Sequence, residues 1–234
     1  AQMINFAIPG TGSSGHLGGG LLLAILLGPH AAFLVLASVL TVQALFFADG
    51  GLLALGANLF NLGVFPCFVA YPLVYRLVAG DKPSDGRLAF AAVLAAVLGL
   101  QMGALGVVVE TVGSGLTSLA FATFAALMLP IHLGIGLVEG AATAALVIFL
   151  RRARPDLVDR SLPAPVKSRA VAGLAIAAAL VAGVLSWFAS PHPDGLEWSI
   201  ARATGTEEIK PPEGGLHARL AAIQEKLSVL PDYD

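Results

Sequence analysis

Lys and Arg are absent from the first 75 residues of this chain, where Asp49 is the only formally charged residue. Residues 88–150 carry only two formal charges, on Glu110 and Glu139. A helix needs about 20 consecutive apolar residues to cross a bilayer core, and this chain contains several such runs. Membrane-spanning segments are helices or closed barrels, because lipid cannot hydrogen-bond to the backbone. Since these runs are continuous and do not alternate, the sequence predicts an all-α, polytopic transmembrane helical bundle.

The overall composition agrees with this prediction. Hydrophobic residues make up 57% of the chain and charged residues 12%, whereas a soluble domain has about 45–50% and about 25%. The sequence contains no basic stretch with interleaved aromatic residues, so it gives no indication of nucleic-acid binding. The single cysteine, Cys67, excludes disulfides and a cysteine metal cluster, and we interpret it as a small buried hydrophobic residue.

Turn residues divide the apolar sequence into segments. Pro29 has no N–H and disfavours a helical Gly28, so a helix break is predicted there, and Pro130 offers a place for a kink. The Gly-rich stretch 9–20 is predicted to be a broken or re-entrant loop, and the residues before it the end of a helix. The predicted apolar segments are 17–28, 31–48, 52–79, 88–112, 116–150 and 170–188.

Basic residues predict the orientation. Nine of the 13 Lys and Arg lie in or beside two connectors, 80–87 and 151–169, which the positive-inside bias places in the cytoplasm. An even number of crossings must separate them, so 116–150 counts as one crossing. The same count places 190–234 outside, with an amphipathic external helix near 216–230. We therefore expect a multi-pass protein of the inner (plasma) membrane.

One sequence motif suggests nucleotide binding but lacks the sequence context that such a site needs. Residues 10–15 spell G-x-G-x-x-G, but a dinucleotide site requires a preceding strand and an acidic residue about 20 positions later, and no Asp or Glu occurs before Asp49. Neither G-x-x-x-x-G-K-[ST] nor H-E-x-x-H occurs. The sequence thus predicts neither ATP hydrolysis nor an intramembrane zinc protease of that type, and we expect no enzyme and no prosthetic group.

His16 closes the Gly-rich loop at the mouth of a predicted span. Such a histidine is often structural or interfacial, but imidazole is also a ligand suited to Co²⁺, Ni²⁺, Cu²⁺ and Zn²⁺. Ser13 and Ser14 are predicted to orient it. Asn5 is a further candidate to orient the histidine or line its cavity.

Other polar residues lie inside apolar segments, where they are costly and usually face a bundle interior. His132 precedes Glu139 by seven residues, which puts both on one helix face if the helix continues past Pro130. Either a structural pair or a substrate path explains them. Three amides, which often bond between helices, are also predicted to line a cavity: Gln43, Asn58 and Asn61.

Several blocks of sequence together resemble one family. The strings are AQMINFAIPGTGSSGHLGGGLLLAILLGP, QALFFADGGLLALGANLFNLG and LPIHLGIGLVEGAATA. They are similar to the cobalt/nickel substrate-binding membrane subunits of energy-coupling-factor transporters, the CbiM/NikM family. The string FASPHPDGLEW resembles the PDGLE motif of the NikN-like accessory component, whose residues here are Pro193, Asp194, Gly195, Leu196 and Glu197.

The resemblance implies capture of Co²⁺ or Ni²⁺ at the outer face. A transmembrane coupling subunit and two cytoplasmic ATPase subunits would then drive transport. In this family an N-terminal Met-His and the histidine of the S-G-H loop hold the metal in a square plane, and that loop histidine corresponds to His16. Nitrogen ligands in a plane favour Ni²⁺.

The resemblance also implies three parts. Residues 1–155 correspond to the metal-binding transmembrane domain, 156–169 to a cytoplasmic basic linker, and 170–234 to the PDGLE module with one span and an external tail. The family's Met-His-Ile start and first span are not in this sequence, so we expect it to be trimmed at both ends. The alternative function is a structural or regulatory subunit that does not bind metal. An intramembrane enzyme or a channel lacks supporting residues.

Overall fold

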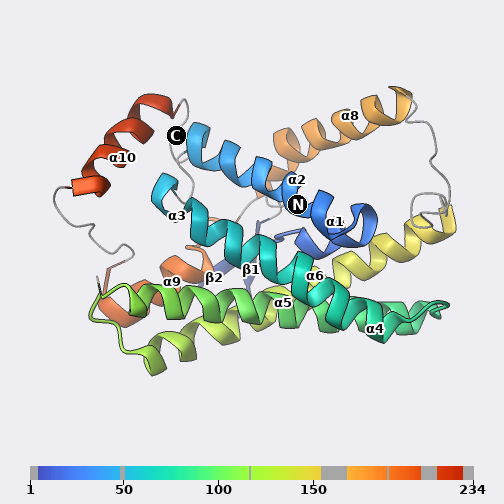
Figure 1. The fold of residues 1–234 in the computed structure, drawn as a ribbon, viewed down its shortest axis with the longest axis horizontal. Helices are drawn as coiled ribbons and strands as arrows, with labels where there is room; N and C mark the ends of the chain where they lie inside the picture. Colours follow the sequence, from blue (N-terminus) through green and yellow to red (C-terminus); the bar gives the residue numbers. More distant parts are fainter. Residues whose placement is uncertain are drawn as a thin grey trace.

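The computed structural model describes residues 5–47, 51–115, 117–153, 168–188, 190–206 and 215–228. It is a helical bundle, which confirms the predicted fold class (Figure 1). Within the described residues, four helices are long and apolar enough to cross a membrane: Pro29–Phe47, Gly51–Ala79, Asp85–Gly113 and Phe121–Ala153.

The described part of the chain starts with a short antiparallel hairpin, and not with the end of a helix. Strands β1 (Asn5–Ile8) and β2 (Ser13–His16) pair so that Asn5 lies opposite His16. Gly10 and Gly12 both have φ of +78°, which a residue with a side chain rarely adopts, and they permit the tight turn. The helical prediction is therefore wrong for Asn5–Ile8, and Ser13–His16 of the predicted loop form a strand.

The predicted helix break is confirmed. Helix α1 (Gly20–Leu27) ends at Gly28, whose φ is +88°, and α2 (Pro29–Val42) begins with its proline in the first turn. A proline there loses no helical hydrogen bond, because the first N–H groups of a helix have no partner in any case. A short π-helical segment, η1 (Gln43–Phe47), continues α2.

The next long helix has an unexpected centre. It is formed by α3 (Gly51–Asn58), the π-helix η2 (Leu59–Tyr75) and α4 (Arg76–Ala79). Pro66 and Pro72 lie inside η2. Each proline removes a backbone donor and clashes with the preceding turn, so the regular α-helical ladder cannot pass through them undisturbed. The sequence predicted one helix here but not its π-helical winding.

Helices α5 (Asp85–Gly113) and α6 (Phe121–Ala153) form the centre of the bundle. Most of the apolar stretch 116–150 forms one continuous helix, α6, which continues through Pro130 and is long enough for the single crossing predicted there. Beside this proline, Gln101 of α5 donates a hydrogen bond from Nε2 to the Leu129 carbonyl at 2.8 Å. The polar side chain ties the two helices together at the weakened turn.

Glycines bring α5 and α6 into close contact. A Cβ atom added at Gly136 would lie 2.9 Å from the Val97 Cα, and one added at Gly140 would lie 2.5 Å from the Val93 Cα. No larger residue fits without moving a backbone. This small-xxx-small spacing is typical of tightly packed membrane helices.

The two basic connectors meet at one end of the bundle. Arg151 and Arg152, at the end of α6, form salt bridges with Asp85 at the start of α5. Arg151 also donates from Nη1 to the Pro83 carbonyl at 2.8 Å. The expected placement of both connectors on one side therefore agrees with the structure, whereas residues 154–167 lie outside the described ranges.

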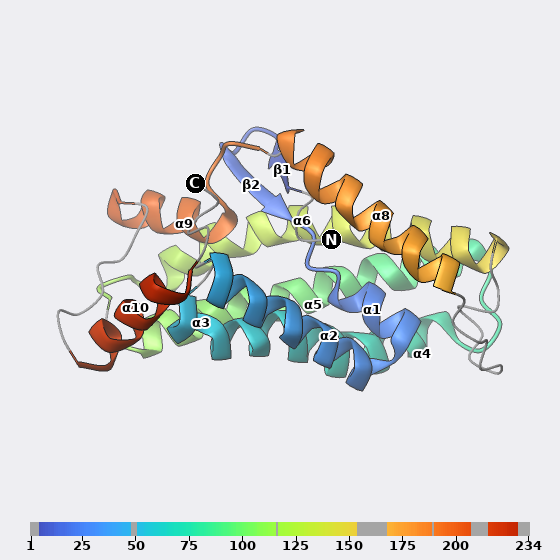
Figure 2. The ribbon, with the colours of Figure 1, turned by 90° about the horizontal axis from the view of Figure 1, so that it is seen from above.

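The C-terminal part runs along the bundle to its other end. It contains α8 (Ser168–Val184), the 3₁₀ turn η3 (Leu185–Phe188), α9 (Gly195–Thr204) and α10 (Gly215–Leu227). Helices α9 and α10 lie at the end away from α4 (Figures 1 and 2). The predicted span 170–188 falls on α8 and η3, which are not among the four described helices that are long and apolar enough to cross a membrane. The predicted amphipathic tail helix corresponds to α10.

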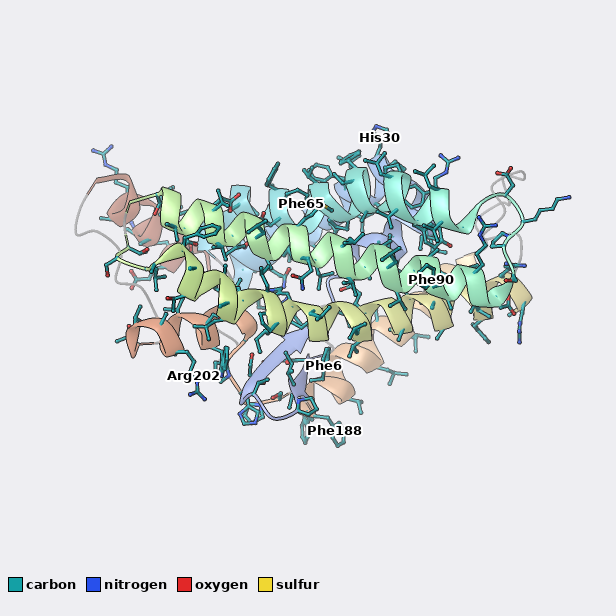
Figure 3. All side chains as sticks on the ribbon, turned by 90° about the horizontal axis from the view of Figure 1, so that it is seen from below. Phe6, His30, Phe65, Phe90, Phe188 and Arg202 are labelled. Atoms are coloured by element: carbon teal, nitrogen blue, oxygen red, sulfur yellow. The ribbon has the colours of Figure 1, made fainter. Side chains whose placement is uncertain are left out.

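Large apolar side chains cover the outside of the bundle. Phe90, Leu34, Leu77 and Phe149 are each more than 60% exposed, and Phe90 is labelled in Figure 3. Inside, small residues such as Ala92 and Ala95 are fully buried. This arrangement suits a bundle surrounded by lipid, where close packing holds the helices together.

We expect the substitution Gly140→Val to destabilise the bundle by about 1–3 kcal/mol, because the added atoms overlap the α5 backbone. The control is Gly56→Val, since a Cβ at Gly56 meets nothing within 4 Å. Thermal unfolding in detergent measures both. Equal melting temperatures for the two variants would contradict the close contact between α5 and α6.

Candidate metal-ion cavity

A cavity of about 210 Å³ lies between the hairpin, the central helices and the start of α9. Its polar walls come from parts of the chain that are far apart in sequence. Among the described residues that line it there is no Lys or Arg. The polar and ionisable side chains at its wall are His16, Gln43, Asn58, Asn61, His132, Glu139 and Asp194.

His16 is the last residue of β2 and lines the cavity, while its role as a metal ligand stays a prediction. His132 and Glu139 line the same cavity. Two imidazoles and a carboxylate therefore share this region. The hairpin register fixes where His16 emerges, because a slip by one residue would turn its side chain to the other face.

Glu139 holds the turn that follows His16. Its Oε2 accepts a hydrogen bond from the Gly18 N–H at 2.8 Å, and its Oε1 accepts one from the Gly19 N–H at 3.1 Å. The residue is only 2% exposed. A buried carboxylate is costly unless it is hydrogen-bonded, and these two amides provide that compensation. Glu139 thus anchors the loop between β2 and α1.

His132 and Glu139 both line the cavity, so the predicted shared helix face is consistent with the structure. Their hydrogen bonds, however, go to different partners. His132 Nδ1 lies 2.9 Å from the Met128 carbonyl oxygen of the preceding turn. If Nδ1 carries the proton, this bond leaves Nε2 as the ring nitrogen with a free lone pair.

The three predicted amides lie at the cavity wall. Asn61 donates from Nδ2 to Glu110 Oε2 at 2.7 Å, while its buried Oδ1 has no hydrogen-bond partner. The bond to Glu110 was not predicted, because Glu110 and Asn61 are 49 positions apart. Pairwise hydrogen bonds of this kind between membrane helices cannot be inferred from sequence spacing.

The hairpin residues predicted to support His16 have other contacts. Ser13 and Ser14 are fully buried but do not line the cavity. The Ser14 hydroxyl donates to the His192 carbonyl at 2.8 Å, so it is turned toward the C-terminal part of the chain. Asn5 faces His16 across the hairpin, and its Oδ1 is buried without a partner.

The PDGLE segment reaches the same cavity. Asp194, Gly195 and Leu196 line it, whereas Pro193 and Glu197 do not. Asp194 caps α9, with Oδ1 accepting from the Leu196 and Glu197 N–H groups at 2.8 Å each. In return, the Glu197 Oε2 accepts a hydrogen bond from the Asp194 N–H at 3.2 Å. The D-x-x-E spacing was a sequence signal for this capping box, and our sequence analysis missed it.

The described residues supply few side-chain ligands for a metal ion. Within them, no group of three or more His, Cys, Asp and Glu side chains is close enough together to hold one. Cys67 is fully buried against the Gly20 carbonyl and does not line the cavity, as its interpretation as a hydrophobic residue predicts. Among the described residues that line the cavity, His16 and His132 carry the imidazole nitrogens.

The fold and the cavity define a class: a multi-pass helical protein with a histidine-bearing polar cavity at the junction of its spans. Residues 1–157 match the family described as CbiM, "Cobalt uptake substrate-specific transmembrane region", and residues 168–234 match the PDGLE domain. This chain belongs to the CbiM family and carries a fused PDGLE domain. It is a multi-pass membrane protein of a cobalt and nickel transport family.

Several similar proteins support this assignment. A putative fused nickel transport protein NikMN from Archaeoglobus fulgidus is 41% identical over 78% of this chain and 58% of its own length. A fused nickel transport protein NikMN from Rhodobacter capsulatus is 33% identical over 99% of this chain and 73% of its own. A cobalt transport protein CbiM from Sorangium cellulosum is 35% identical over 65% and 68%. The chain thus spans less than two thirds of the Archaeoglobus relative.

A solved structure has the same fold. A crystal structure described as a transition metal transporter matches with a TM-score of 0.53 and 32% identity, covering 63% of this chain and 69% of that one. The relatives are transport proteins by name, in agreement with the expectation that this chain is not an enzyme.

We expect Glu139→Gln to loosen the loop after His16. A glutamine side chain offers one acceptor and one N–H₂ group, so one of the two glycine amides loses its partner, at a cost of about 1–3 kcal/mol. Hydrogen–deuterium exchange of the peptide containing Gly18 and Gly19 should accelerate. In the control Glu110→Gln, the glutamine oxygen can still accept from Asn61. Unchanged exchange in the Glu139 variant would refute the anchoring role.

Proposed function

We propose that this protein captures Co²⁺ or Ni²⁺ at the outer face of the inner (plasma) membrane for import. The observation that carries the proposal is the position of His16 at the wall of a polar cavity. Glu139 and Asp194 share that cavity, and no cationic side chain lines it among the described residues. A divalent transition-metal ion suits this combination of imidazole and carboxylate side chains.

The remaining donors would come from beyond the described residues. His16 supplies one imidazole, and the N-terminal Met-His implied by the family resemblance would supply further nitrogen atoms. Nitrogen donors in a plane favour Ni²⁺, whereas Co²⁺ depends less on this geometry. The relatives bear both nickel and cobalt transport names, so the choice between the two ions stays within the proposal.

The same proposal includes partners. A transmembrane coupling subunit and two cytoplasmic ATPases would complete an energy-coupling-factor transporter, with the connectors at 80–87 and 151–169 facing the cytoplasm and 190–234 outside. Arg76, Arg87, Arg151 and Arg152 give one end of the bundle its positive charge. That end would face the cytoplasmic partners, because positive charge favours the cytoplasmic side.

A second candidate is a structural or regulatory subunit that does not bind metal. The absence of a three-residue ligand cluster among the described side chains favours it. The two candidates predict opposite results in a direct binding measurement.

We expect His16→Ala to abolish or weaken binding of Ni²⁺ and Co²⁺ by at least about tenfold, because a ligand is lost. Isothermal titration calorimetry on this chain, and on a longer form that carries the N-terminal Met-His, measures the effect. His30→Ala is the matched control: His30 is exposed on α2, contacts Phe68, and lies on the side of the bundle opposite the hairpin (Figure 3).

Two results would reject metal capture. One is the absence of binding of either ion to the longer form. The other is equal affinity in the His16 variant and the unsubstituted protein. Both results would favour the structural or regulatory function.

A further inference from the structure

The PDGLE segment is bonded directly to the strand that ends in His16. The Ser14 N–H donates to the Pro193 carbonyl at 2.7 Å, and the Ser14 hydroxyl donates to the His192 carbonyl at 2.8 Å. Ser14 and His16 are two positions apart in β2, so their side chains leave the same face of the strand. The segment is therefore hydrogen-bonded to β2 two residues before His16, the candidate ligand.

A second contact attaches the hairpin turn to α9. The Trp198 indole N–H donates to the Thr11 carbonyl at 3.0 Å, and the Arg202 guanidinium lies 5.4 Å from the Trp198 ring centroid. Thr11 lies between Gly10 and Gly12 at the tip of the hairpin. The PDGLE module thus holds the hairpin both at its turn and along its second strand.

Gly195 lies directly against the cavity wall. A Cβ atom added there would be 2.9 Å from the Ile131 Cγ2 and 3.2 Å from the His132 Cε1. Asp194 and Leu196, on either side, line the cavity. The capping box of α9 uses the Asp194 carboxylate and the Asp194 backbone N–H. The carbonyls of the two preceding residues, His192 and Pro193, accept from Ser14.

We propose that residues 192–196 are a latch on the ion cavity: they hold the His16 strand in register, cover His132, and so slow the departure of a captured Ni²⁺ or Co²⁺. This inference rests on the proposed capture function. Ser14 and Gly195 are positioning residues, because they act on the ion through His16 and His132. The Asp194 carboxylate lines the same cavity wall and attracts a cation electrostatically, without having to coordinate it.

The test uses Gly195→Val, which wedges the segment away from His132. The protein is loaded with radioactive Ni²⁺ and mixed with excess EDTA, and the release rate is followed. We expect release to be at least about tenfold faster than from the unsubstituted protein, since several hydrogen bonds are lost together. Gly183→Val is the matched control, because a Cβ on this α8 glycine meets nothing within 4 Å.

Two milder variants keep the test independent of folding. Ser14→Ala removes one bond of the latch, and Asp194→Asn removes the charge but keeps a capping side chain. Each is expected to accelerate release about two- to fivefold. Trp198 reports docking directly: with Trp187→Phe as background, it is the only tryptophan, and acrylamide should quench it more strongly once the segment detaches.

The outcomes separate the two proposals. Faster release together with stronger quenching of Trp198 supports the latch. Release rates of Gly195→Val and Ser14→Ala that equal the unsubstituted rate overturn it, whatever Trp198 shows. If neither this chain nor the longer form that carries the N-terminal Met-His binds Ni²⁺ or Co²⁺, both the capture function and the latch are rejected.

Discussion

A non-helical backbone can lie inside a membrane protein only where protein groups satisfy its hydrogen bonds. The segment from β2 to α1 meets this condition through one carboxylate. Glu139 of α6 accepts from both glycine amides of the turn, across a separation of about 120 residues in sequence. Without that carboxylate, the half-buried Gly18 N–H and the buried Gly19 N–H would lose their acceptor. The position of His16, and with it the shape of the cavity, depends on this contact.

Close helix packing makes this contact possible. Gly136 and Gly140 let α6 approach α5, and Glu139 is carried on the same turn of α6. Glu139 therefore lies on α6 between the two glycines that pack closely against α5. Hydrogen-bonded polar groups add specificity to packing that apolar side chains alone leave less defined.

The sequence predicted the features that arise from local chemistry or from charge. The uncharged runs predicted the helical segments, and the Gly28-Pro29 pair predicted the break between α1 and α2. The basic connectors predicted that 80–87 and 151–169 lie on one side. Seven-residue spacing placed His132 and Glu139 on one face. The Asn61–Glu110 bond was not predictable, because it joins segments 49 positions apart. The π-helical winding of η2 and the hairpin at Asn5–His16 were missed although their signals are local: two prolines lie inside η2, and two glycines with positive φ form the hairpin turn.

The covalent fusion of the PDGLE module to the transmembrane domain changes the energetics of their contact. Docking within one chain is an intramolecular event, for which a tether gives an effective concentration of up to the millimolar range. The bonds from Ser14 and Trp198 can therefore be individually weak and still keep the two parts together most of the time. A contact of this kind remains easy to reverse, and each module is always paired with one copy of the other.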